Sequence, residues 1–191
     1  LGGAYWWVVA LGAVFTLARF SEAFLVLRVQ QGGLPLAWTP LVLVLMNVVF
    51  ALGAYPLGKL ADSTRHTTLL AWGLVVLIAA DALLAFSDRG AAAWLGIALW
   101  GLHMAMTQGL LATMVADTAP ADLRGTAFGM FNLVSGVALL VASGLAGLLW
   151  DRLGASATFG AGILFATLAL AGVLVQSARH GRTPKPPATQ G

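Results

Sequence analysis

The stretch Gly58–Asp62 (Gly-Lys-Leu-Ala-Asp) ends one long apolar run, and Gly147–Asp151 (Gly-Leu-Leu-Trp-Asp) ends another with the same Gly-x-Leu-x-Asp spacing. A small residue lets two membrane helices approach each other, and a carboxylate is best tolerated at the polar edge of a bilayer. Each copy therefore predicts the turn after a membrane-spanning helix. Chance recurrence in a chain rich in glycine and leucine is the alternative. We favour a repeat because both copies end equivalent apolar runs.

The composition identifies an integral membrane protein. Of the 191 residues, 60% are hydrophobic and 9% are charged, whereas a soluble domain has about a quarter of its residues charged. Cysteine is absent, which excludes disulfides and thiolate metal sites. The net charge of +3 comes from basic residues that lie mainly between or after apolar runs, where they set membrane topology. We therefore expect no nucleic-acid partner, no metal and no cofactor.

Six apolar stretches are each long enough to cross about 30 Å of hydrocarbon as a helix. They predict helices over about 5–30, 36–60, 67–86, 92–117, 125–150 and 155–175. The predicted fold is thus an all-α membrane bundle over residues 1–178. Residues 179–191 form a basic tail that contains three prolines.

Six spans place both termini on one side of the membrane. That side includes the turns after the second and fourth spans as well as the tail. Its basic residues are Lys59, Arg65, Arg124, Arg179, Arg182 and Lys185. The opposite side has Arg28, Arg89 and Arg152. Because basic residues are enriched in cytoplasmic loops, this difference predicts cytoplasmic termini, and we expect a bacterial inner-membrane protein.

The two Gly-x-Leu-x-Asp copies end the second span of two successive three-helix sets, which cover about 1–88 and 90–178. Because three is odd, the second copy faces the opposite side of the membrane from the first. The pattern therefore predicts a 3+3 inverted repeat. Such repeats are nested within each half of some secondary transporters.

The first copy, followed by Arg65 and His66, resembles the loop signature of the major facilitator superfamily, Gly-x-Leu-Ala-Asp-Arg-x-Gly-Arg-Lys. That signature lies between the second and third helices of a six-helix half. The second copy is similar to it over residues 147–154, and Pro120–Gly129 is similar to the start of the family's eleventh helix. The first copy departs from the signature at Ser63 and Arg65, where the family has Arg and Gly.

The resemblance implies the C-terminal half of a major facilitator transporter, helices seven to twelve. Such a half needs a partner, either an N-terminal half or a second copy of itself. It also implies a loop gate, in which Asp62 latches onto the other half. The residues implied at the two loop motifs and at the Pro120–Gly129 motif are Gly58, Asp62, Arg65, Arg124, Gly125, Gly147, Asp151 and Arg152.

Arg19 and Glu22 are charged residues within the first predicted span. Each costs about 2.5 to 3.5 kcal/mol at a helix centre in lipid, so both should face protein or a water-filled cavity. At a spacing of i, i+3 they lie on one helix face and can touch. The two residues could form a structural ion pair, or they could bind a substrate or a proton, and the sequence favours neither role over the other. Glu22 is the better candidate for a proton carrier, because burial favours the protonated form of a carboxyl group.

His103, Thr107 and Gln108 lie near the middle of the fourth predicted span. The resemblance places this span beside the first at a central cavity, where the three could join Arg19 and Glu22 in a polar site. The alternative for His103, which we slightly favour, is a structural hydrogen bond to a carbonyl of a neighbouring helix.

The remaining polar and small residues of the spans have structural interpretations. The resemblance directs Asn47 and Asn132 toward the other half, although interhelical hydrogen bonding is their more common use. Asp81 is expected to have a structural partner. A stripe of small residues within 125–147 predicts that the fifth span is a closely packed, inward helix.

The predicted function is transport of a small solute by a secondary active transporter that works by alternating access and is open to proton coupling. The expected partners are the lipid bilayer, a second six-helix half and a small-molecule substrate. A self-associating six-helix bundle without transport activity is the alternative. An intramembrane enzyme is less favoured, because neither a Gly-x-Ser-x-Gly nor a His-Glu-x-x-His signature is present.

Overall fold

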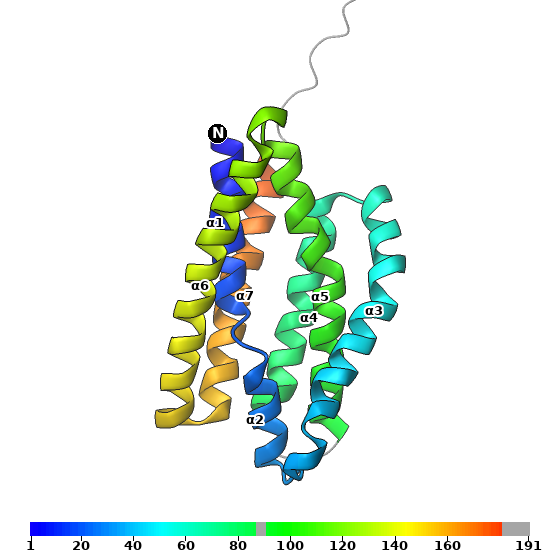
Figure 1. The fold of residues 1–191 in the computed structure, drawn as a ribbon, viewed down its shortest axis with the longest axis vertical. Helices are drawn as coiled ribbons and strands as arrows, with labels where there is room; N and C mark the ends of the chain where they lie inside the picture. The colour runs from blue at the N-terminus through cyan, green and yellow to red at the C-terminus, as the bar shows by residue number, and fades with distance from the viewer. Residues whose placement is uncertain (87–90, 181–191) are drawn as a thin grey trace, which may run out of the picture.

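The computed structural model describes residues 1–86 and 91–180, which form a bundle of helices that run up and down (Figure 1). The elements are α1 Gly3–Ala18, α2 Ala23–Gln31, the 3-10 helix η1 Leu36–Trp38, α3 Pro40–Ser63, α4 His66–Phe86, α5 Ala91–Thr118, the 3-10 helix η2 Ala121–Leu123, α6 Arg124–Leu153 and α7 Ala155–His180. Six segments of this described part are long and apolar enough to cross a membrane, which confirms the predicted spans. The predicted turn at 87–90 and the tail from 181 onward lie outside the described residues.

The helices form two groups that meet at α4. In Figure 1, α1, α6 and α7 lie on one side, and α3, α4 and α5 lie on the other. α4 packs against both α5 and α7 and so joins the groups. The ends of α1 and α7 share one end of the bundle, where Ala4 and Gln176 line a common pocket. The two Gly-x-Leu-x-Asp copies lie at opposite ends of the bundle, as an inverted arrangement requires, and the repeat itself stays a prediction (Figure 1).

Close backbone approach holds α3 against the bundle. A Cβ added at the buried Gly101 of α5 would collide with the main-chain carbonyl of Met46 on α3, and would lie 3.2 Å from the Cβ of Val49. Met46 is itself completely buried at this contact. Only a glycine lets the two helices meet so closely, which is the usual role of small residues in membrane helix packing.

The glycines of the small-residue stripe of α6 do not pack against another helix of the described chain, contrary to the prediction of a closely packed inward helix. α6 contacts α1, α5 and α7 through a different face. A Cβ added at Gly125, Gly129, Gly136 or Gly147 would have no neighbouring atom within 4 Å. Within the described residues, α3 is poorly covered as well as α6. Of its most apolar 18-residue stretch 11% is buried, compared with 50% for α4. The bundle therefore presents two apolar helices on opposite flanks (Figure 1).

Candidate substrate-binding region

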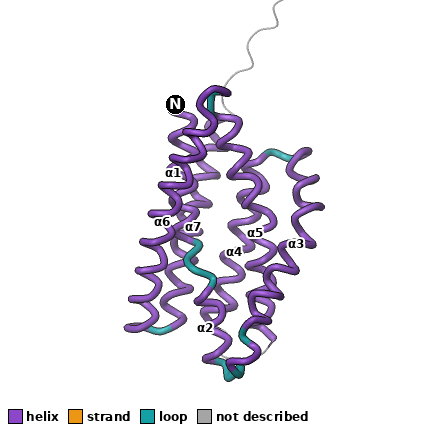
Figure 2. The backbone as a smooth tube through the Cα atoms, viewed as in Figure 1, coloured by secondary structure: helices purple, strands orange, loops and turns teal. Residues whose placement is uncertain are grey.

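The first predicted helix is interrupted at its middle, where Arg19 to Glu22 separate α1 from α2 (Figure 2). The prediction of one continuous helix over 5–30 is wrong here. The Thr16 hydroxyl donates to the Gly12 carbonyl at 2.7 Å, where it competes with the main-chain N–H that donates there in a regular helix. The Arg19 amide turns back to the Thr16 carbonyl at 3.0 Å. The two segments therefore meet at a non-helical stretch within a membrane span.

The interruption is anchored to α6 by a backbone hydrogen bond. The Ser21 amide donates to the Ser143 hydroxyl of α6 at 3.2 Å. Near the start of α1, the buried Tyr5 hydroxyl donates to the Ala127 carbonyl of α6 at 2.9 Å. Both bonds join residues 122 positions apart, so α1 and α6 run in parallel in one register. Unwound backbone inside a membrane protein must be satisfied by other protein groups, and Ser143 satisfies it here.

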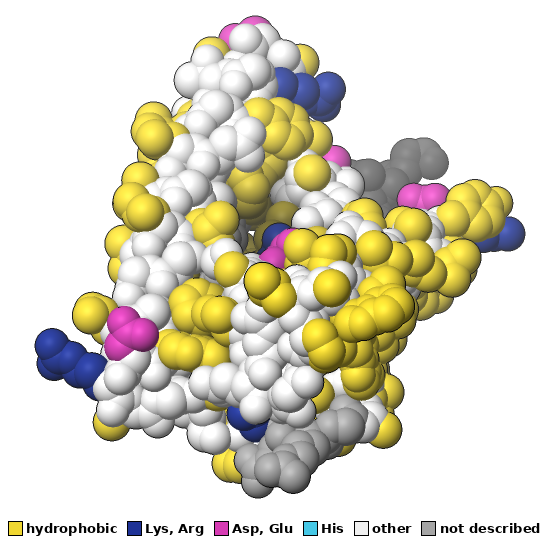
Figure 3. All heavy atoms as spheres, turned by 60° about the horizontal axis from the view of Figure 1, so that its bottom comes forward, with side chains coloured by type: hydrophobic (Ala, Val, Ile, Leu, Met, Phe, Trp, Pro, Cys, Tyr) yellow, Lys and Arg dark blue, Asp and Glu magenta, His cyan; other side chains and the backbone are white. Residues whose placement is uncertain are grey.

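Arg19 and Glu22 lie in the interruption and are partly buried. Their opposite charges are close enough to attract each other. In the described chain, however, no ion pair within 4.0 Å joins them, because they do not share the face of a regular helix as the i, i+3 spacing predicted. Figure 3 shows acidic and basic atoms inside a hollow of an otherwise largely apolar face. Two opposite charges therefore lie beside unwound backbone inside a membrane span.

His103 is completely buried between α4 and α1. Its Nδ1 lies 2.8 Å from the Gly73 carbonyl of α4, and its ring stacks on Phe15 with centroids 5.2 Å apart. The buried Thr107 hydroxyl donates to the His103 carbonyl at 2.8 Å. The expected structural hydrogen bond of His103 is therefore present, and the ring lies near the interruption.

Gln108 is exposed and lies apart from this buried group. It lines a cavity of about 370 Å³ between α3 and α5, together with Gly58, Asp62 and His66. The five predicted site residues are thus divided. Arg19, Glu22 and His103 lie near one another, whereas Gln108 belongs with the signature loop at one end of the bundle.

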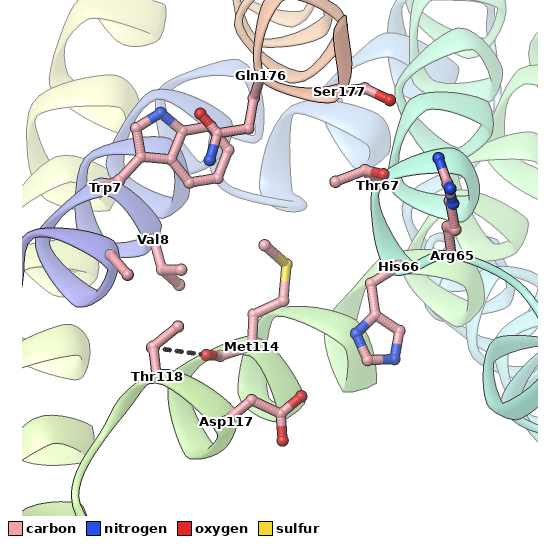
Figure 4. Close-up of a pocket in the computed structure, with 11 residues that line it drawn as sticks. Trp7, Val8, Arg65, His66, Thr67, Met114, Asp117, Thr118, Gln176 and Ser177 are labelled. Carbon is pink, nitrogen blue, oxygen red and sulfur yellow. Dashed lines mark hydrogen bonds between the residues drawn. The ribbon is translucent and has the colours of Figure 1, made fainter. Parts of the chain in front are cut away.

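A second cavity, of about 440 Å³, lies on the other side of the same loop (Figure 4). Arg65, His66 and Asp117 of α5 line it, with the His66 ring turned toward the side of Asp117, and Trp7 and Gln176 line its far side. The sequence analysis did not select Asp117. Its position at the end of a span, opposite a basic loop, was the available signal.

The other predicted residues do not join either group. Asn47 is exposed on α3 and donates from its amide to the Leu43 carbonyl at 2.8 Å, and Asn132 is exposed on α6. The remaining residues of the loop motifs are exposed at the two ends of α6, namely Arg124, Gly125, Asp151 and Arg152. Within the described residues, no cluster of three or more His, Cys, Asp or Glu side chains could hold a metal ion.

A family model described as Major Facilitator Superfamily matches residues 1–143. The chain belongs to the major facilitator superfamily. This confirms the resemblance found in the loop motifs. The proteins of this family that match the chain are transporters and not enzymes, so the intramembrane-enzyme alternative is dropped.

Relatives of this major facilitator chain are longer than the chain itself. An MFS-type transporter from Methanocaldococcus jannaschii is 31% identical over 148 residues, which cover 74% of this chain and 37% of the relative. The structure of an autoinhibited POT family peptide transporter matches with a TM-score of 0.74 and 23% identity, over 97% of this chain and 39% of that one. The POT family transporter PepTSo matches with a TM-score of 0.69 and 18% identity, over 98% and 39%. These two likenesses concern the fold.

Proposed function

We propose that this chain is one half of a secondary active transporter that moves a small solute across a membrane by alternating access. The observation that supports the proposal is the interruption between α1 and α2, which carries Arg19 and Glu22 within a membrane span. Interrupted helices near the bilayer midplane hold the substrate and coupling-ion sites of many secondary transporters. A charge pair at such a site is costly in lipid and therefore argues for a function.

The partner in this proposal is a second six-helix half, either an N-terminal half or another copy of this chain. α3 and α6 present apolar faces that the described chain leaves uncovered, and α6 has glycines along its open face. Glycines on an open face permit close packing of another helix. Asn47 and Asn132 are exposed on these two helices, where they can bond to the partner.

The proposed site has two parts. Arg19 and Glu22 bind the solute or a proton at the interruption, with His103 and Thr107 beside them and Glu22 as proton carrier. Gln108 lies with Asp62 in the cavity next to the signature loop. This cavity and the one that contains Arg65 then belong to the gate on the cytoplasmic side of a bacterial inner membrane.

A matched pair of charge-removing variants tests the site. The complete gene product is reconstituted in liposomes, and uptake of a labelled zwitterionic dipeptide, a monocarboxylate and a lipophilic amine is measured. Arg19→Gln should weaken the apparent affinity for the transported solute by roughly tenfold or more, because a charge-assisted contact is lost. Lys59→Gln removes the same charge from an exposed position at the end of α3 and should leave uptake nearly unchanged.

Two results would contradict these proposals separately. If Arg19→Gln and Glu22→Gln affect uptake as little as Lys59→Gln does, Arg19 and Glu22 do not form the binding site. A folded complete gene product that moves none of the probes, with or without a proton gradient, argues against transport. It favours the alternative of a self-associating bundle, for which a native mass near twice the 19.7 kDa of this chain is the direct evidence.

A further inference from the structure

Asp81 is a buried carboxyl group on α4 without a partner. It is completely inaccessible, and neither of its oxygens has a hydrogen bond. The expectation that Asp81 has a structural partner is therefore wrong. An ionised carboxylate that is buried and unpaired costs several kcal/mol, so a buried acid without partners needs an explanation.

Asp81 lies against α7 beside the interruption. A Cβ added at Gly162 of α7 would collide with the Oδ2 atom of Asp81 and would lie 3.1 Å from the ring of Phe20. Phe20 belongs to the interrupted segment, and its ring packs on those of Trp100 and Phe159 with centroids 5.6 and 5.5 Å away. The indole N–H of Trp100 is also buried without a partner. Two polar groups without hydrogen-bond partners thus border one buried aromatic cluster that includes part of the interruption.

Few charges can reach Asp81 from the elements packed around it. On α5 the nearest titratable side chain is His103, which is held at the Gly73 carbonyl. From α2, the Nε atom of Arg28 donates to the Leu84 carbonyl at 2.7 Å. The described side chains of α7 include no titratable group. Arg19, next to Phe20 in the interruption, is the cation whose main chain is not fixed in a helix.

We propose that Asp81 is a proton-binding site whose occupancy controls the conformation of the interrupted segment. The inference rests on the proposed transport function and adds a second carboxyl group to it. In the conformation described, the proton stays on a carboxyl oxygen of Asp81, and the neutral acid packs against Gly162 and Phe20. Transfer of that proton to water leaves a carboxylate that must be compensated. Arg19 then moves toward α4 and displaces Phe20, so that the interruption changes shape.

Infrared difference spectroscopy after a pH jump tests the protonation step. The complete gene product in lipid should show a protonated-carboxyl band that shifts when the protein is labelled with carboxyl-¹³C aspartate. The band should disappear in Asp81→Asn and persist in Asp122→Asn, which alters an exposed carboxylate in η2. A band that persists in Asp81→Asn overturns the assignment. So does a wild-type protein without an aspartate band, a result that does not depend on whether the variant folds.

Cysteine labelling tests the link to the interruption. The 191 residues contain no cysteine, so Ala23→Cys places a single thiol at the exposed start of α2. Because a thiol reacts faster as it ionises, the labelling rate is divided at each pH by that of free cysteine in solution. The resulting ratio should change with pH by up to about tenfold per pH unit in the titration range, the limit for one linked proton. Asp81→Asn should abolish that dependence, whereas Asp122→Asn should keep it. An unchanged pH dependence in Asp81→Asn refutes the proposal.

Neither measurement needs a solute. A failed uptake assay therefore contradicts the proposed function without deciding the state of Asp81. Conversely, uptake by Asp81→Asn with the wild-type pH profile contradicts the role of Asp81 in coupling and leaves transport standing.

Discussion

Replacing Gly101 by alanine directly tests how α3 is held. The added Cβ would meet the backbone of α3, with the Met46 carbonyl carbon at 3.1 Å and the Val49 Cβ at 3.2 Å. A flexible side chain could rotate away from a new methyl group, but a helix backbone cannot. α3 must therefore move as a unit, and it loses packing along its contact with α5.

The size of the effect follows from two opposing contributions. Overpacking of a close contact costs about 1 to 3 kcal/mol. Alanine is favoured over glycine inside a helix by about 1 kcal/mol. Because the obstacle is backbone, we expect the upper part of the overpacking range and a net loss of about 1 to 2 kcal/mol for Gly101→Ala. For a chain of this size that loss lowers the unfolding midpoint by roughly 2 to 8 °C.

Gly109→Ala is the matched control on the same helix. Gly109 is exposed on α5, and a Cβ added there would meet no atom within 4 Å. This variant keeps the helix-propensity gain without the collision, so its thermal unfolding midpoint in detergent should equal or exceed that of the wild type. If Gly101→Ala is as stable as Gly109→Ala, α3 and α5 do not approach at Gly101 as described.

Three further substitutions test single hydrogen bonds. Ser143→Ala removes the acceptor of the Ser21 amide, which costs about 1 to 3 kcal/mol. Hydrogen exchange at the Ser21 amide should be faster in Ser143→Ala than in the wild type, and unchanged in Ser143→Thr. The same exchange rate in Ser143→Ala and the wild type would disprove the anchor. His103→Leu loses the contact with the Gly73 carbonyl and the ring stacking, and should lower the free energy of unfolding by about 1 kcal/mol. Tyr5→Phe should cost about 1 kcal/mol through the lost bond to α6, measured in the same unfolding assay; a wild-type midpoint argues against that bond.

The spans were predictable because the bilayer imposes their length and hydropathy. The predicted start and end of α5, for example, differ from the observed Ala91–Thr118 by one residue each. The interruption in the first span was not predictable in this way. Residues 19–22 contain neither proline nor glycine, and the group that satisfies the Ser21 amide is 122 positions away on α6. A local pattern does not contain that information.

The candidate site was predictable only in part, and for the same reason. The cost of a charge in lipid directed Arg19 and Glu22 toward protein or a cavity, as an ion pair or as a site, and the same argument assigned a structural partner to Asp81. The structure leaves Asp81 unpaired because α7 presents Gly162 there and not a polar side chain. Likewise, the small residues of α6 predicted close packing without indicating whether the partner helix belongs to this chain.

The position of Ser143 links the open face of α6 to the interruption. Its hydroxyl holds the Ser21 amide, while Gly136 and Gly147 on the same helix face no atom of the described chain. A helix of a second half that packs on those glycines contacts the element that anchors the interruption. Because helices are stiff along their axes, an axial shift of α6 carries Ser143 with it and strains that hydrogen bond. Movement of one half against the other would therefore be transmitted to the segment that carries Arg19 and Glu22.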